Sequence, residues 1–489
     1  MYTLTIFPKK IITQQIVRNT FHARKTRYGY AVLLFHMAIF ASATFTQAQE
    51  AKQKISDYRE TPIKTNELIH TKLNISFNYQ KQCLYGEEWV TIKPYFNPTD
   101  SLTLDTKGME LKQIALVHNG KLIPLKFDYT DSLTIKVRLD KTYYKNEKYT
   151  LYIKYTSWPG KLKTGLNATL RSKGLFFINP EGLEKDKPIQ IWTQGETESS
   201  SVWFPTIDKP NQKTTQEIAI TVPTKYTTLS NGLLTYQKRN TDGTRTDTWK
   251  MNLPHAPYLF MIAVGDFKIY YDKWQQKAVD YYLEPQFAPF AKDIFGDTPE
   301  MMSYFSKILG VNFPWPKYAQ VVVREHTMGG SMENTSATLH GDFMQRTSKE
   351  LIDIDYSGLQ LTIAHEFFHQ WFGDYVTAES WSNLTVNESF ADYSEVLWAE
   401  HRFGKDEADA HNERSLKKYL ASTESHSKNL VRFYYDDKED TFDAMVTYSK
   451  GGRILNMLRV YLGDAVFFHG LNLYLTKNAF KIPKHNRSV

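Results

Sequence analysis

The sequence predicts a multi-domain α+β protein, with a β-rich domain (the β domain) over residues 49–266 and a mainly helical domain (the helical domain) over residues 267–489. Two observations support this division. From about Lys72 to Phe267, apolar and polar residues alternate with a period of two, and turn-forming pairs such as Asn119-Gly120 separate the runs. In the second half, apolar residues recur mostly at helical spacing. The change of period marks the predicted domain boundary.

Residues 1–48 are expected to be a signal peptide. They hold six of the net +7 charges and no acidic residue, so the rest of the chain carries only +1. The basic part leads into the apolar run Ala31–Phe40, and Thr46-Gln47-Ala48 is a plausible cleavage site. An uncleaved membrane anchor is the alternative, but the run is shorter than the roughly 20 apolar residues that cross a bilayer. We therefore expect export to the periplasm or the medium.

Charge and cysteine content exclude several other classes. After residue 48 the chain is nearly neutral, so there is no reason to expect nucleic acid or an anionic membrane surface as a partner, and no stable membrane span is expected. Cys83 is the only cysteine, so no disulfide can form within the chain. The oligomeric state stays open.

The helical domain is expected to begin with a small sheet. A last β segment runs through Tyr281–Leu283, and Gln320–Arg324 has the composition of a buried strand. Between them, Thr298–Leu309 has helical spacing, and helices dominate after residue 359, including Gly452–Leu462.

The most informative stretch is His365-Glu366-Phe367-Phe368-His369, an H-E-x-x-H sequence. On a helix, His365 and His369 lie one turn apart on one face, so both imidazoles can bind one metal, and zinc is the usual metal. Glu366 lies beside them, where it can take a proton from a metal-bound water. The alternative, that both histidines are ordinary helix residues, requires a chance match to the motif.

Glu388 is the predicted third metal ligand, with eighteen residues between it and His369. This gap fits a helix that ends at Gly373 and a second helix that returns beside the first. The metzincin pattern is excluded, because it requires glycine and histidine where this chain has Phe372 and Tyr375. Asp392, four residues after Glu388, is expected to accept a hydrogen bond from one of the ligand imidazoles, as outer-shell carboxylates often do.

Two further segments complete a longer pattern. Gly330-Ser331-Met332-Glu333-Asn334 precedes the H-E-x-x-H helix, and Asn387-Glu388-Ser389-Phe390-Ala391 follows it. In order and spacing, the three segments resemble the signature of the zinc aminopeptidase family of aminopeptidase N and leukotriene hydrolase, which are gluzincins. The resemblance extends from about residue 60 to residue 475.

This resemblance implies a saddle-like β domain followed by a thermolysin-like catalytic domain that binds one Zn²⁺ ion per chain. It implies that Glu333 and Glu196 bind the free α-amine of a peptide, and that Gly330, Ser331 and Met332 hold the peptide. In the same way it implies that Glu366 is the general base for attack by a zinc-bound water and that Tyr448 stabilises the oxyanion. These roles suit an exopeptidase, because carboxylates attract an ammonium group and a tetrahedral intermediate needs a placed donor.

The resemblance leaves alternatives open. One branch of the family hydrolyses a lipid epoxide at the same metal, and an inactive peptide-binding descendant is a third possibility. The chain departs from the family pattern at Ser389, where glycine is usual, and at Thr385, where an aromatic residue is common. The family usually continues beyond Tyr474 with further helices, so we expect the helical domain to be incomplete at its C-terminus. The preferred N-terminal residue of the substrate is not determined by the sequence.

Overall fold

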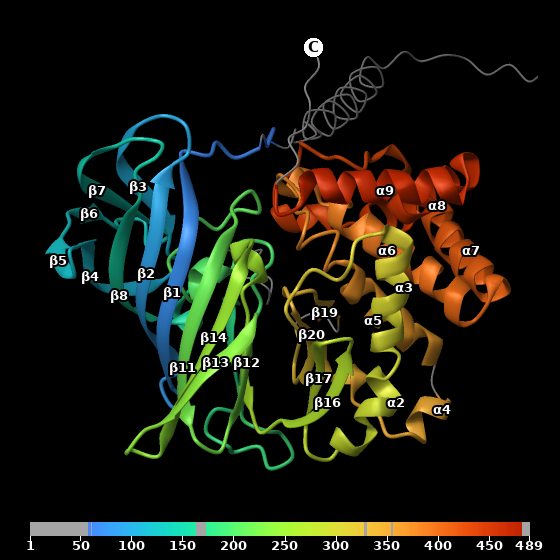
Figure 1. Ribbon diagram of the computed structural model, residues 1–489, viewed down its shortest axis with the longest axis horizontal. Coiled ribbons are helices and arrows are strands. Elements are labelled where there is room, and N and C mark those ends of the chain that lie inside the picture. The colour runs from blue at the N-terminus through green and yellow to red at the C-terminus, as the bar shows by residue number, and fades with distance from the viewer. Residues whose placement is uncertain (1–56, 60, 163–172, 327–329, 354–355, 482–489) are drawn as a thin grey trace, which may run out of the picture. The chain divides into compact units, whose positions relative to one another are not determined.

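The computed structural model describes residues 57–481, except residues 60, 163–172, 327–329 and 354–355. The predicted signal peptide lies outside the described residues. The described residues belong to one compact unit, with strands in its first half and helices in its second (Figure 1). Every helix in the described part of the chain is too short or too polar to cross a membrane.

An eight-stranded sheet with the order β13-β14-β11-β1-β2-β8-β4-β5 forms the main part of the β domain. The predicted alternation is present: Leu73 and Ile75 of β1 are buried, while Asn74 between them is partly exposed. β1 pairs parallel with β11 and antiparallel with β2. The strands are β1 (Asn66–Asn78), β2 (Cys83–Pro94), β4 (Met109–His118), β5 (Lys121–Pro124), β8 (Tyr149–Ser157), β11 (Thr214–Pro223), β13 (Leu233–Arg239) and β14 (Thr244–His255).

Two smaller sheets complete the β domain. One has the order β3-β7-β6, with β3 (Thr99–Asp105), β7 (Thr134–Tyr143) and β6 (Phe127–Asp128). The other has the order β12-β15-β10-β9, with β12 (Thr227–Ser230), β15 (Ile262–Gly265), β10 (Gln190–Thr193) and β9 (Leu175–Ile178). Every residue of β10 and β15 is buried. Trp192 on β10 donates from Nε1 to the Arg324 carbonyl at 3.1 Å, which ties this sheet to the following domain.

A five-stranded sheet with the order β16-β17-β18-β20-β19 opens the helical domain. Its central pairs, β17 with β18 and β18 with β20, are parallel, and all of β18 is buried. β19, which carries Ser331 and Met332, lies at the edge of the sheet. The strands are β16 (Lys268–Trp274), β17 (Lys277–Leu283), β18 (Tyr318–Val323), β19 (Ser331–Met332) and β20 (Ala337–Gly341).

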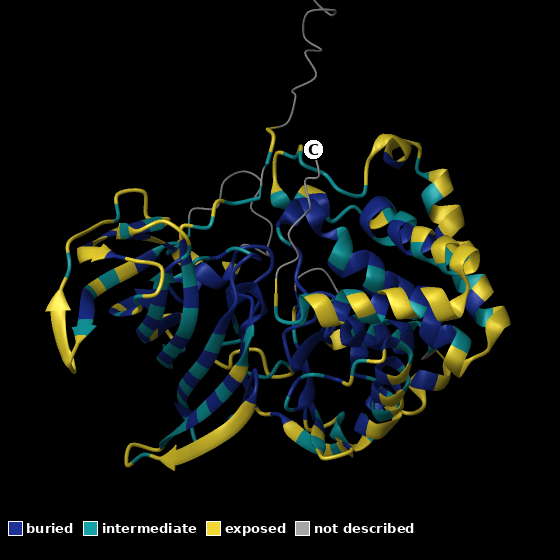
Figure 2. Cartoon of the chain, turned by 45° about the horizontal axis from the view of Figure 1, so that its top comes forward, coloured by how far each residue is buried: buried dark blue, intermediate teal, exposed yellow. Residues whose placement is uncertain are grey.

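Helices make up most of the rest of the chain, and their outward faces are exposed (Figure 2). They are α2 (Ala291–Phe295), α3 (Thr298–Leu309), α4 (Glu350–Asp353), α5 (Tyr356–Phe368), α6 (Thr385–Arg402), α7 (Lys405–Ala421), α8 (Gly451–Leu462) and α9 (Asp464–Asn478). The predictions for α3, β18 and α8 are confirmed to within two residues, and the α+β fold class is confirmed. The predicted boundary at residue 266 falls between β15 and β16, at the passage from one sheet to the next.

Buried lysines connect the two domains. Lys317, which is 4% exposed, donates from Nζ to the carbonyls of Ser230 in the β domain and Ser336 in the helical domain, both at 3.1 Å. Burial lowers the pKa of Lys317 to about 7, although the charge of Asp280 opposes this. In the same way, Lys213 donates to the carbonyls of Asp374 and Tyr375. Each ammonium satisfies two buried carbonyls at the cost of a desolvated charge.

Lys317 should make stability depend on pH. Its folded-state pKa lies below the ordinary value of 10.5, so the unfolded chain binds the extra proton between about pH 7 and pH 10. The free energy of unfolding should therefore rise through this window, by at most about 1.4 kcal/mol per pH unit from this group. Urea unfolding of the K317M variant should show a smaller rise than the unmodified chain. K268M, which removes an exposed lysine, is the control variant. If stability rose equally with pH in K317M and in the unmodified chain, Lys317 would not be the group that causes the rise.

Candidate active site

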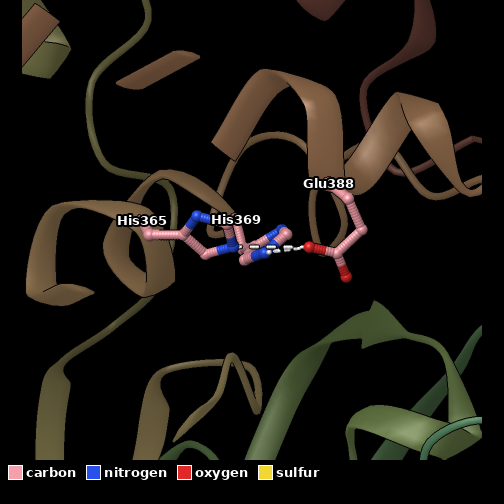
Figure 3. A group of neighbouring side chains, drawn as sticks. All are labelled: His365, His369 and Glu388. Atoms are coloured by element: carbon pink, nitrogen blue, oxygen red, sulfur yellow. Dashed lines mark hydrogen bonds and ion pairs between the residues drawn. The ribbon is translucent and has the colours of Figure 1, made fainter. Parts of the chain in front are cut away.

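The side chains of His365, near the C-terminal end of α5, and His369, just after that end, point toward the same place (Figure 3). The helix ends at Phe368, five residues before the predicted end at Gly373. The reason is a tight turn in which Asp374 N donates to the His369 carbonyl and Gly373 N to that of Val376. Gly373 has a φ of 139°, which favours glycine. His369 N still donates to the His365 carbonyl at 3.3 Å, so the one-turn relation between the two histidines is kept.

Glu388 lies in the first turn of α6 and completes the group. Its Oε2 is 3.3 Å from His365 Nε2 and 3.4 Å from His369 Nε2, and it is 4% exposed. Four ligands at zinc–ligand distances of about 2.0–2.1 Å in a tetrahedron lie about 3.3 Å from one another. The spacing of these two nitrogens from the carboxylate oxygen therefore fits a zinc ion, as does the N, N, O donor set.

The outer nitrogens of both imidazoles have partners. His365 Nδ1 lies 2.9 Å from Glu395 Oε1, and His369 Nδ1 lies 3.0 Å from the Phe372 carbonyl. With Nδ1 as donor to these oxygens, both Nε2 atoms are free to face a metal. The tautomer that metal binding requires is thus set by the fold.

The prediction for Asp392 is corrected by these contacts. Its carboxylate accepts from Arg453 Nη2 on α8 at 3.0 Å, and Glu395 takes the place predicted for it beside His365. Both Asp392 and Glu395 share the helical face of Glu388, one turn and two turns further on. The spacing alone could not choose between them, because the choice depends on where Arg453 lies.

A cavity of about 240 Å³ opens onto this group. It brings together most of the predicted site residues, although they come from five separate segments of the chain. It is lined by Gln194, Glu196, His326, Gly330, Ser331, Glu333, His365, Glu366, His369, Glu388, Phe442 and Tyr448. Met332 instead packs in a buried apolar cluster with Tyr258 and Trp381. His326 and Phe442 carried no signal in the sequence, because no short motif includes them.

The carboxyl groups of the cavity are strongly perturbed by burial. In the protein chain alone, burial raises the pKa of Glu366 to about 8 and also raises that of Glu333. Burial would raise the pKa of Glu388 too, but the two imidazoles lower it below its ordinary value. With Glu196, four buried acidic side chains line this small cavity, and nearby cations would stabilise their charged forms. A metal ion and a substrate ammonium would both be such cations.

Tyr448 lies in a short π-helix, Ala444–Lys450, and the centroid of its ring is 6.0 Å from that of His365, with nearly parallel ring planes. Such turns are frequent at functional sites. The turn is held from both sides: Asp443 caps it through Met445 N and Val446 N, and Ser389 Oγ on α6 donates to the Thr447 carbonyl at 2.6 Å. Ser389, which stands where the family usually has glycine, therefore links the turn that carries Tyr448 to helix α6 by a hydrogen bond.

Two family models match the chain in the same order as its two domains. Residues 66–259 match the peptidase M1 N-terminal domain, and residues 294–486 match the peptidase family M1 domain. The chain belongs to peptidase family M1. The match confirms the predicted family and fold class, and it supports zinc as the cofactor and metallopeptidase as the class of enzyme.

Curated relatives are similar at moderate identity. Aminopeptidase N of Streptomyces lividans is 29% identical over 62% of this chain and 36% of its own length. Endoplasmic reticulum aminopeptidase 1 of Rattus norvegicus is 24% identical over 93% of this chain and 49% of its own length. Glutamyl aminopeptidase of Homo sapiens is 28% identical over 60% of this chain and 31% of its own length. The chain thus spans half or less of these relatives.

Solved structures share the fold over most of their length. A mutant M1 zinc metallopeptidase from Deinococcus radiodurans, bound to a Tyr-Ser-Ala substrate, aligns with a TM-score of 0.69 at 20% identity, over 86% of this chain and 88% of that chain. The M1 zinc metallopeptidase from the same organism aligns with a TM-score of 0.67 at 19% identity, over 88% of this chain and 89% of that chain. Both confirm the architecture described above.

The contacts on α6 predict different effects for two neighbouring carboxylates. Glu395→Gln should weaken zinc binding by about 10- to 100-fold, because the partner of His365 loses its charge. Asp392→Asn should change zinc affinity by less than about 3-fold, because it contacts Arg453 rather than an imidazole. Competition with a chromogenic chelator measures both affinities. A larger loss in D392N than in E395Q would restore the original prediction.

Proposed function

We propose that the protein is an aminopeptidase that removes N-terminal residues from peptides. One observation carries this proposal: Glu196 of the β domain lines the same cavity as the metal ligands and Glu333. An endopeptidase needs a groove that is open on both sides of the cleaved bond. Here two carboxylates from different domains line the cavity, and they would close one side of it, because their charge suits an ammonium group and not a continuing chain.

The edge strand β19 supports the placing of a peptide. Ser331 pairs with His340 and Met332 with Leu339, and β19 ends the order of the sheet, so among the described residues its other side has no neighbouring strand. An extended peptide can add to such an edge through main-chain hydrogen bonds. Gly330 and Ser331 line the cavity, so the peptide would enter beside the metal ligands with its amine toward Glu333 and Glu196.

The chemistry follows from three groups of this chain. Zinc, when bound by His365, His369 and Glu388, supplies a Lewis acid that lowers the pKa of water to about 7. Glu366 would accept the proton of the attacking water and pass it to the leaving amine. Tyr448 would donate from its hydroxyl to the oxyanion, a contribution of a few kcal/mol for a preorganised donor.

The polar character of the cavity favours a peptide over the alternatives. Most of its lining side chains are charged or polar, whereas a lipid epoxide would need a largely apolar channel. Glu366 and Tyr448 both line the cavity, which supports an active enzyme rather than an inactive peptide-binding descendant.

The amine-binding role of the two carboxylates can be tested directly. Glu333→Gln and Glu196→Gln should each lower kcat/KM for aminoacyl anilides by about 30-fold or more, because removing one partner of a buried charge pair costs about 2–5 kcal/mol. Zinc content should not change. Glu87, whose carboxylate pairs with Lys154 in the β domain, gives the control variant E87Q. Efficient internal cleavage of an N-acetylated peptide by the unmodified enzyme would point to an endopeptidase instead.

Tyr448→Phe should separate binding from chemistry. Loss of the hydroxyl donor should lower kcat by about 100-fold or more with little change in KM, because the hydroxyl acts mainly in the transition state. The phenyl ring keeps its place beside His365, so zinc content should stay the same. Steady-state kinetics with one anilide substrate measures both constants, and a pure increase in KM would contradict the assigned role.

Export of the protein is part of this proposal and is supported by the basic and apolar pattern of residues 1–48. Expression of the whole chain in a Gram-negative host should yield a mature protein that lacks about the first 48 residues and is released with the periplasmic fraction. Mass spectrometry of its N-terminus identifies the cleavage site. An intact N-terminus in the cytosolic fraction would contradict export.

A further inference from the structure

Glu198 is a buried carboxylate in the loop that follows β10. The loop carries Gln194 and Glu196, and two of its hydrogen bonds are internal to the β domain: Gln194 N to the Gly174 carbonyl and Ser199 N to the Gly195 carbonyl. The Glu198 side chain is 7% exposed. Its Oε2 accepts from Lys209 Nζ at 2.6 Å and from Lys438 Nζ at 2.5 Å.

These contacts join the loop to two other parts of the site. Lys438 begins the short helix Lys438–Thr441, directly before Phe442 of the cavity wall and the turn of Tyr448. Trp381, whose Nε1 donates to Glu198 Oε1 at 3.2 Å, lies at the start of the segment that leads into α6 and Glu388. One carboxylate therefore binds a β-domain lysine and two residues of the helical domain.

Charges around Glu198 are close to balanced. On the β-domain side, Lys107 donates to the Glu198 main-chain carbonyl, and Asp105 Oδ2 lies 3.9 Å from Lys209 Nζ. Asp208 accepts from Ser201 N at 2.8 Å. On the other side, Thr197 Oγ1 lies 3.5 Å from Glu439 Oε1. Lys438 thus provides the one ammonium from the helical domain among the contacts of the Glu198 carboxylate in the described residues.

We infer that the Glu198–Lys438 ion pair is a positioning contact that sets the place of Glu196 in the amine site from the other domain. Glu196 is two residues from Glu198 on the same short loop, so a shift of the loop moves its carboxylate relative to Glu333. Misplacement by about 1 Å can cost roughly 100-fold in a catalytic site. This inference rests on the proposed role of Glu196.

Three variants separate positioning from folding. Lys438→Met removes the ion pair between the domains but leaves the Trp381 hydrogen bond, and Glu198→Gln removes the shared charge while keeping the side-chain shape. Lys209→Met is the matched control, because it removes the other ammonium on the same oxygen but leaves the Glu198–Lys438 ion pair intact. Thermal unfolding and zinc content show whether each variant folds and holds its metal.

The readout is the part of ligand affinity that depends on the amine. Leucine hydroxamate and its analogue without the amine, 4-methylpentanoyl hydroxamate, should inhibit the unmodified enzyme with very different constants. In K438M and E198Q this ratio should fall by about 10-fold or more, while inhibition by the amine-free compound stays within about 2-fold. K209M should keep the ratio within about 2-fold. An unchanged ratio in K438M, or equal weakening of both compounds, would overturn the inference.

A failure of the proposed function gives a different result. If the unmodified enzyme does not distinguish the two hydroxamates, the amine role of Glu196 is wrong. Hydrogen exchange of residues 194–200 then decides the positioning contact by itself. Faster exchange in K438M than in K209M supports it, and equal exchange in the two variants overturns it.

Discussion

Compensation of buried negative charge is the constraint on which the site depends. Glu333, Glu366 and Glu388 are each less than 10% exposed and line one cavity of about 240 Å³. Isolated carboxylates in such a place are costly, and the two imidazoles offset only part of that cost. The surrounding fold keeps the carboxylates together, so that cations entering the cavity complete the charge balance. Metal binding and the proposed recognition of an ammonium group would therefore both follow from the same electrostatic arrangement.

Helix α6 connects the buried carboxylates of the site to the rest of the helical domain. One face carries Glu388 to the metal group, Ser389 to the Tyr448 turn and Glu395 to His365. Further contacts run from Asp392 to Arg453 on α8. Because these residues share one helix, a shift of α6 would move a metal ligand, an imidazole partner and the support of Tyr448 together. Such shared support makes the geometry of the site rigid.

The β domain contributes a residue to the cavity and buried polar contacts with the helical domain. Its loop after β10 supplies Glu196, and Lys317 and Glu198 connect it to the helical domain by buried polar contacts. Buried polar contacts have a steep geometric dependence, because an unpaired buried group is costly. They therefore help to define the relative placement of the two domains. This placement brings Glu196 into the wall of the same cavity as Glu333.

The sequence by itself determined the two-part architecture, and it predicted the group of His365, His369, Glu388 and Glu366 that the structure brings together, because each depends on local spacing. A one-turn relation between His365 and His369 holds wherever the segment is helical, and period-two alternation predicts strands without knowledge of their partners. The tertiary structure decided the contacts that join distant segments. Glu395 rather than Asp392 lies within hydrogen-bond distance of His365, because the Asp392 carboxylate accepts a hydrogen bond from Arg453 of α8. His326, Phe442 and Glu198 acquire their places only when segments far apart in the chain pack together, and no local pattern encodes such packing.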